Sequence, residues 1–156
     1  MLSDPKHQNC LDRLTERLRL APAATRDLVL SVAADACPRL AVLKQAGKAA
    51  RIDQLIAAGA WSDAALALIE LELPAWTLRR LVYEDGEWFC SLSKQPNLPV
   101  ALDDTADARH AVLPLAILSA FVEACRVRGL ARETNSPTVP QIRLITAGAI
   151  CCDNFF

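Results

Sequence analysis

The sequence is short of three things: long apolar runs, net charge and clustered glycines. Its longest apolar stretches, around residues 64–73 and 111–120, are interrupted well short of the roughly 18 residues that a membrane-spanning helix needs. The formal net charge is −1, with 17 basic and 18 acidic residues, so no overall field attracts nucleic acid or an anionic membrane. The five glycines stand singly, outside any phosphate-binding glycine motif. We therefore expect no membrane, no nucleic acid and no nucleotide cofactor as a partner.

Metal-binding and disulfide patterns are also missing. The six cysteines show no CxxC spacing, and the two histidines, His7 and His110, belong to no HExxH motif. The start, MLSDPKHQNCLDRLTERLRL, is charged throughout and lacks the apolar core of a secretion signal, which predicts a cytoplasmic protein with reduced thiols. We therefore expect buried free thiols and no metal or other cofactor. The cysteines are Cys10, Cys37, Cys90, Cys125, Cys151 and Cys152.

What the sequence does contain is typical of one globular domain. Of its 156 residues, 53% are hydrophobic and 22% charged, which is the balance of a folded protein of that size. We expect a single domain over residues 1–130, followed by a linker and C-terminal tail over 131–156. Within the tail, QIRLITAGAICC is a candidate strand that could pair with an edge of a sheet.

The N-terminal half predicts five helices, because apolar residues recur there at three- and four-residue spacing. Thr25 can cap the second helix, and Pro38 separates it from the third. The fifth, SDAALALIELELP, is apolar nearly all round, which predicts a buried helix. The expected ranges are 4–21, 26–37, 39–47, 52–59 and 62–73.

The stretch WTLRRLVYEDGEWFCSLSKQ predicts a β-hairpin over about residues 76–93, because alternation, aromatic residues and a turn coincide there. We favour a three-residue loop of Glu84, Asp85 and Gly86, since a two-residue loop would place Glu84 directly opposite Glu87. In this register one face should rest on the helix that contains Leu118 and Val122. That face would hold Trp76, Leu78, Val82, Trp88, Cys90 and Leu92, with Arg80 as its one charge.

The segment after the hairpin predicts an extended loop and then helix. Asp104 or Thr105 can cap the helical part, and apolar residues continue on one face to an expected end at Gly129. Pro114 either kinks this helix or begins a second helix in its first turn, and we favour the second arrangement. The whole pattern predicts an α+β fold that is mostly helical, with the hairpin packed on helices.

Two groups of residues are candidates for chemistry. Asp103, Asp104 and His110 lie six to seven residues apart, and an acid beside a histidine can perform general acid–base catalysis. Capping of a helix by the aspartates is the competing structural explanation. The second group consists of candidate ligand-binding residues in the hairpin, where arginines and aromatic rings could form a recognition surface. Its members are Arg79, Arg80, Tyr83 and Trp88.

The segments LVYEDGEWFCSLSKQPNLP and HAVLPLAILSAFVEA resemble a group of small α-proteobacterial proteins of unknown function. The resemblance covers roughly residues 76–126 and does not extend into the tail after Gly129. It implies no activity, cofactor or site residue for this chain.

Three functions are open at this point. The leading hypothesis is a non-enzymatic protein-interaction or scaffolding domain that self-associates, because apolar helix surface is abundant and reactive motifs are not. The alternative is a small-molecule-binding protein or enzyme with a pocket between the hairpin and the helical segment 106–128. The third is nucleic-acid binding through Arg79 and Arg80, although such proteins usually carry a wider basic surface.

Overall fold

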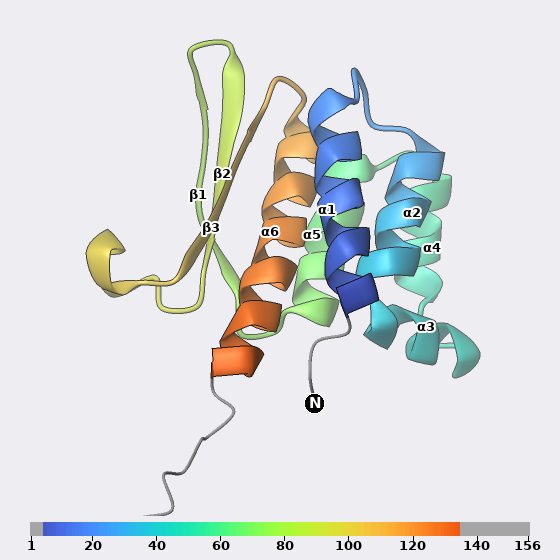
Figure 1. Cartoon of the computed structure of the whole chain (residues 1–156). Helices are drawn as coiled ribbons and strands as arrows, with labels where there is room; N and C mark the ends of the chain where they lie inside the picture. Colours follow the sequence, from blue (N-terminus) through green and yellow to red (C-terminus); the bar gives the residue numbers. More distant parts are fainter. Residues whose placement is uncertain (1–4, 135–156) are drawn as a thin grey trace, which may run out of the picture.

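The computed structural model describes residues 5–134 and has the expected α+β fold, with six helices and one antiparallel sheet in the order β1-β2-β3. Figure 1 shows the sheet on one side of α6 and the N-terminal helices on the other. The elements are α1 Pro5–Leu20, α2 Arg26–Ala36, α3 Pro38–Gln45, α4 Ala50–Ala57, α5 Trp61–Glu72, β1 Thr77–Glu84, β2 Glu87–Ser93, a 3-10 turn Val100–Leu102, β3 Thr105–His110 and α6 Leu113–Thr134.

The five N-terminal helices agree with the sequence pattern. The Oγ1 of Thr25 accepts a hydrogen bond from the Leu28 N–H at 3.3 Å and so caps α2, as predicted. Pro38 is the first residue of α3, where its missing N–H has no helical partner to lose. The apolar positions of α1, Leu11, Leu14 and Leu18, are all buried. As expected from its composition, α5 is also largely buried.

The central helix, α6, is buried on nearly all sides. It contacts β2 and β3 on one side and α1, α2 and α5 on the other, as Figure 1 illustrates. Its fully or almost fully buried residues are Leu115, Ala116, Ile117, Leu118, Ala120, Phe121, Val122, Ala124 and Cys125. The predicted packing of the hairpin on the helix that contains Leu118 and Val122 is therefore confirmed.

Strand β3 replaces the helix expected before Pro114. Residues 105–110 alternate between polar side chains and small apolar ones, so Ala106 and Ala108 turn toward α6 and Ala106 is fully buried. The prediction of a short helix before Pro114 was wrong. Alanine favours helix in an isolated peptide, but here the small side chains of Ala106 and Ala108 allow a strand to lie close to α6. Pro114 does lie in the first turn of α6, as predicted.

The far end of α6 also differs from the expectation. The helix continues through Gly129 to Thr134 instead of ending at Gly129. The candidate strand QIRLITAGAICC and the rest of the predicted tail lie outside the described residues.

The hairpin turn has two residues, not the three expected. Tyr83 lies opposite Trp88 and Glu84 opposite Glu87. Asp85 and Gly86 have φ angles of 55° and 82°, which is the pattern of the type I′ turn that matches the twist of a hairpin. The repulsion between Glu84 and Glu87 is compensated by Arg80 on the same face of the sheet, whose guanidinium donates a hydrogen bond to the Glu84 carboxylate at 2.8 Å.

This register changes which residues face α6. Leu81 lies opposite the buried Cys90 and packs against the core, whereas Val82 lies opposite Phe89 on the outer face, away from α6. Arg80 also lies on the outer face, so the predicted inner positions of Val82 and Arg80 were wrong. Trp76 is 4% exposed and Trp88 is half-buried against the core. The hairpin is thus held to the helices by its tryptophan-bearing side, as predicted.

The turn can be tested by substitution. We expect Gly86→Ala to lower the free energy of unfolding by about 1 kcal/mol, because an L side chain is strained at this positive φ. No atom lies close enough to clash with the added methyl group, so the backbone alone accounts for the loss. Asp85→Asn should leave the stability unchanged or raise it, since asparagine tolerates the left-handed region. Urea unfolding measures both; equal stability of Gly86→Ala and wild type would contradict the two-residue turn.

Candidate interaction surface

Strand β1 is the part of the sheet that the helices cover least. The contacts of the sheet with α6 come from β3 and β2, while β1 packs chiefly on β2. None of the eight residues of β1 is buried, and five are exposed. In Figure 1 the β1–β2 end of the sheet extends past the start of α6. Both the free edge of β1 and its end near the turn are therefore open to solvent.

Apolar side chains are exposed on this side of the molecule. Among the described residues seven large hydrophobic side chains are exposed, and two of them, Leu78 at 41% and Tyr83 at 58%, belong to β1. Two more, Leu98 and Leu102, belong to the segment that follows β2. The ring of Tyr83 stacks at an angle on Trp88, with 5.2 Å between ring centroids. Tyr83 is thus held in place while most of its surface stays accessible.

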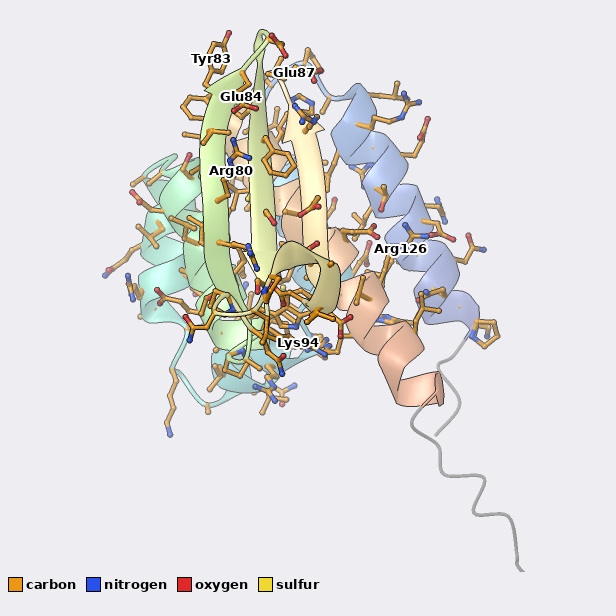
Figure 2. All side chains as sticks on the ribbon, turned by 90° about the vertical axis from the view of Figure 1, so that its left-hand side faces the viewer. Arg80, Tyr83, Glu84, Glu87, Lys94 and Arg126 are labelled. Carbon is orange, nitrogen blue, oxygen red and sulfur yellow. The ribbon has the colours of Figure 1, made fainter. Side chains whose placement is uncertain are left out.

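The outer face near the turn carries an arginine–aromatic stack. The guanidinium groups of Arg80 and Arg109 lie 5.8 Å and 4.8 Å from the centroid of the Phe89 ring, one from β1 and one from β3. Figure 2 looks onto this face and shows Arg80 and Glu84 on β1 below the turn. Cation–π contacts of this kind hold long side chains in fixed positions. Tyr83 belongs to the inner face, opposite Trp88, but is exposed beside the same edge of β1. We call the outer-face residues Arg80, Glu84, Phe89 and Arg109, together with Tyr83, the hairpin surface.

Among the residues proposed to bind a ligand, Tyr83 and Trp88 meet on the inner face of the hairpin, whereas Arg80 lies on the outer face against Phe89. Arg79 is separated from them. A β-bulge between Leu78 and Arg80 leaves Arg79 without a partner on β2. Its guanidinium instead donates to the carboxylate of Asp103 and to the carbonyl oxygen of Leu98.

Asp103 fixes the segment 94–104 over the lower half of the outer face. Its Oδ2 accepts hydrogen bonds from Ser93 Oγ and Arg79 Nη1, and its Oδ1 accepts one from the Gln95 N–H at 3.2 Å. These bonds, that from Ser93 above all, hold the pKa of the Asp103 carboxyl below its usual range. The expected capping of a helix by Asp104 or Thr105 is wrong, because strand β3 begins at Thr105. Asp103 ties a loop to the sheet instead.

The proposed group of Asp103, Asp104 and His110 is not brought together. The aspartates precede β3 and His110 ends it, so the length of the six-residue strand, roughly 20 Å, separates them. His110 Nδ1 accepts a hydrogen bond from the Val112 N–H at 2.9 Å, just before α6 begins. Asp104 is exposed. Each of the three therefore has its own local surroundings.

A buried carboxylate that the sequence analysis missed joins three helices. Glu72, the last residue of α5, is 1% exposed. Its Oε2 accepts a hydrogen bond from the Arg39 N–H in the first turn of α3 at 3.2 Å, and its Oε1 lies 3.8 Å from Arg128 Nη2 of α6. Arg128 Nη1 also donates to the Glu72 carbonyl oxygen at 3.0 Å. Burial raises the pKa of Glu72, and the positive charge of Arg128 opposes the shift.

Beside Glu72 lies a cleft of about 210 Å³ between the base of the hairpin and the last turns of α6. It carries three cationic side chains, Arg39, Lys94 and Arg128, and the ammonium group of Lys94 lies 5.3 Å from the centroid of the Trp76 ring. Arg128 is about fifteen residues beyond the start of α6, which places the cleft roughly 20 Å from His110. The cleft is thus well separated from His110.

The described cysteines are free, and three of them, Cys37, Cys90 and Cys125, are buried as expected. Burial raises the pKa of Cys90 and that of Cys125 to about 12 and raises that of Cys37 further. The thiolate needed for nucleophilic attack is therefore disfavoured at these sites. Cys10 is half-buried, while Cys151 and Cys152 lie outside the described residues.

Residues 5–134 contain neither a metal-binding cluster nor a membrane-spanning helix. No group of three or more histidine, cysteine, aspartate or glutamate side chains in this range could hold a metal ion. None of its helices combines the length and the apolar composition that crossing a membrane requires.

Comparisons with protein families, with curated proteins and with solved structures found no match to this chain. The resemblance of residues 76–126 to small α-proteobacterial proteins stays a prediction.

The role of Asp103 can be tested by limited proteolysis. We expect Asp103→Asn to loosen the segment 94–104, because the amide keeps neither the charge nor the full set of acceptors for Ser93, Arg79 and Gln95. Cleavage by trypsin after Lys94 should become several-fold faster. Asp104→Asn, at the exposed neighbouring position, is the matched control and should be cleaved like the wild type. Equal rates for both variants would show that Asp103 does not hold the segment.

The buried Glu72 predicts a pH-dependent stability. Because its pKa is raised in the folded protein, the folded state binds a proton more tightly than the unfolded chain at pH values just above 4.5. Stability from this group is therefore present at low pH and is lost as the pH rises through the raised pKa.

The comparison variant is Glu72→Gln, which can still accept the Arg39 hydrogen bond but cannot ionise. As the pH rises from 4.5 to neutral, the wild type loses the stability that protonated Glu72 contributes, and the variant does not. The free energy of unfolding of the variant minus that of the wild type should therefore increase with pH. Denaturant unfolding at several pH values measures this. Glu70→Gln, an exposed site on the same helix, is the control and should show no such trend; the same flat result for Glu72→Gln would contradict the raised pKa.

Proposed function

We propose that this protein is a non-enzymatic protein-interaction or scaffolding domain that self-associates through the hairpin surface and the adjoining free edge of β1. The observation that carries the proposal is that edge. Strand β1 is an outer strand of the sheet, it packs chiefly on β2, and none of its residues is buried. An exposed strand edge offers unpaired N–H and C=O groups to another chain.

Proteins usually protect such edges with charges, proline or bulges. Here the bulge at Arg79 and the segment tied down by Asp103 protect the lower half of β1. The upper half, from Arg80 to Glu84, has regular pairing with β2 and no such cover. Its two charged residues are already paired with each other, at 2.8 Å. This supports a role for the upper half in binding a partner.

The composition of the hairpin surface supports the same proposal. Arginine and tyrosine are enriched in the parts of protein interfaces that contribute most to binding, and tyrosine adds contact area at a small loss of conformational entropy. Tyr83, Arg80 and Arg109 are exposed and are held in place by contacts with Trp88 and Phe89. Preorganised side chains lose less freedom when a partner binds.

The alternative of a pocket enzyme has less support from these contacts. His110 binds the backbone at the start of α6, and Asp103 is engaged by Ser93 and Arg79 at the other end of β3. Neither His110 nor Asp104 lines the cleft beside Glu72. Acid–base catalysis requires such groups to meet at one reacting atom.

Self-association of the full chain tests the proposal. We expect sedimentation equilibrium to show a concentration-dependent monomer–dimer equilibrium, and Tyr83→Asp to weaken it by about tenfold or more, because a buried interface tyrosine is replaced by a charge. Val42→Asp is the matched control, since Val42 is similarly exposed, at 65% against 58% for Tyr83, but lies on α3. It should not change the equilibrium. A wild-type chain that stays strictly monomeric at near-millimolar concentration would contradict the proposed function.

A further inference from the structure

The backbone of β1 restricts how another strand could join its edge. In the two-residue turn, the Glu84 C=O accepts a hydrogen bond from the Glu87 N–H, so Glu84 and Glu87 form a hydrogen-bonded pair of the ladder. Such pairs alternate with non-hydrogen-bonded pairs along an antiparallel ladder. Leu81 and Tyr83, opposite Cys90 and Trp88, therefore direct their N–H and C=O groups away from β2.

These outward groups have no hydrogen-bond partner within residues 5–134. They lie above the bulge, on the side of β1 that the helices leave open. A further antiparallel strand must bring its own outward groups opposite Leu81 and Tyr83. A second copy of this chain can do so in a small number of ways.

A two-fold symmetric, antiparallel pairing of β1 with itself must have its axis at one residue. An axis between two residues would place a residue whose backbone N–H and C=O point away from β2 opposite one whose groups point toward β2, and these could not form hydrogen bonds. Three centres fall in the regular part of the strand: Leu81, Val82 and Tyr83. With Leu81 at the centre, Arg80 faces Val82 of the second copy. With Tyr83 at the centre, Arg80 faces the turn at Gly86 and Val82 faces Glu84. Both arrangements set a charged side chain against an apolar or turn residue.

The arrangement centred on Val82 is complementary at every position. Arg80 of each copy lies opposite Glu84 of the other on the outer face, which forms two opposite-charge pairs by symmetry. Val82 faces Val82 between them, and Leu81 faces Tyr83 on the inner face. The outward groups of Leu81 and Tyr83 then bond to one another across the axis, as the ladder requires.

We propose that two copies of this chain pair antiparallel through β1, centred on Val82, so that the two three-stranded sheets form one continuous sheet. The proposal rests on the self-association proposed above and assigns its partner and register. The bulge at Arg79 ends the regular edge, so only Arg80–Glu84 of each copy pairs. A contact this short is at the small end of specific interfaces and predicts a weak, reversible dimer.

Charge reversal with mixing tests the register. In a dimer of Arg80→Glu chains, a glutamate at position 80 of each copy faces Glu84 of the other copy. In a dimer of Glu84→Arg chains, an arginine at position 84 of each copy faces Arg80 of the other copy. Each variant alone should therefore associate at least tenfold more weakly than the wild type, because like charges repel. In an equimolar mixture, every Glu faces an Arg, and the heterodimer should form with about the affinity of the wild-type dimer. Contacts within one chain cannot be restored by mixing, so recovery shows that Arg80 and Glu84 meet between chains. Sedimentation equilibrium gives the affinities, and native mass spectrometry identifies the heterodimer.

Arg51→Glu is the control for charge reversal, because Arg51 is similarly exposed but lies on α4 in a comparable surface pair with Glu70. It should associate as the wild type does. If the wild type associates and the mixed variants do not recover, the register is wrong while self-association stands. If the wild type is strictly monomeric, both proposals fall.

A second variant locates the axis independently. Val82→Cys places two thiols directly opposite each other in a non-hydrogen-bonded pair, where the Cα–Cα distance of about 4.5 Å suits a disulfide. With oxidised glutathione as the electron acceptor, two thiols lose two protons and two electrons, and the variant should form a covalent dimer within the population that associates. Thr77→Cys, exposed on β1 but below the bulge, should not.

The C-terminal tail of the same chain is the competing occupant of this edge, since QIRLITAGAICC is a candidate strand. If it occupied the edge, the Val82→Cys thiol would form an internal disulfide with Cys151 or Cys152 in a monomer. Peptide mapping of the oxidised variant distinguishes this product from the dimer, and finding it would overturn the proposal.

Discussion

The burial of α6 on nearly all sides determines the rest of the structure. One helix fills the space between a three-stranded sheet and a group of five helices, and residues such as Phe121, Leu118 and Val122 have no exposed surface. Close packing around one cylinder favours small side chains on the neighbouring strand, which Ala106 and Ala108 of β3 provide. Because α6 is narrower than the sheet, it packs mainly on β3 and β2 and leaves the outer edge of β1 open. The open edge of the sheet is therefore a consequence of how the core is built.

Polar groups near this core are satisfied by contacts between distant parts of the chain. Glu72 binds the first turn of α3 and the arginine of α6, and Asp103 binds the bulged arginine of β1 and the end of β2. A buried carboxylate without such partners would be strongly destabilising. Both sites fix elements that hydrophobic packing alone would position less specifically. Neither carboxylate has neighbouring groups in an arrangement typical of catalysis. Both therefore differ from the polar residues of the hairpin surface, which are exposed to solvent.

The sequence predicted well those features that depend on local periodicity. Five helices, the cap at Thr25, the hairpin and the position of Pro114 at the start of a helix all follow from residue spacing and turn chemistry. The errors occurred where a distant part of the chain decided the outcome. The turn is an exception, because local features decide it, namely the conformations of Asp85 and Gly86 and the pairing of Arg80 with Glu84. Residues 105–110, by contrast, form a strand because α6 and β2 pack against them. For the same reason Glu72 was missed, although an acid on a buried helix just before Pro74 is a visible sign of a distant partner. The contact of Tyr83 with Trp88 depends on the register of the hairpin, and the separation of Arg79 from Arg80 depends on the bulge, neither of which residue spacing alone determines.

The bulge at Arg79 has a further consequence for solubility. An open-ended β-fibril grows by adding strands to a long, flat edge, and a bulge bends and twists the strand that carries it. Only five residues of β1 remain regular, and the opposite edge of the sheet belongs to β3, a short strand with exposed Asp107 and Arg109. Neither edge offers a template that identical chains could extend indefinitely. The molecule can keep one strand accessible at high concentration and still avoid polymerisation.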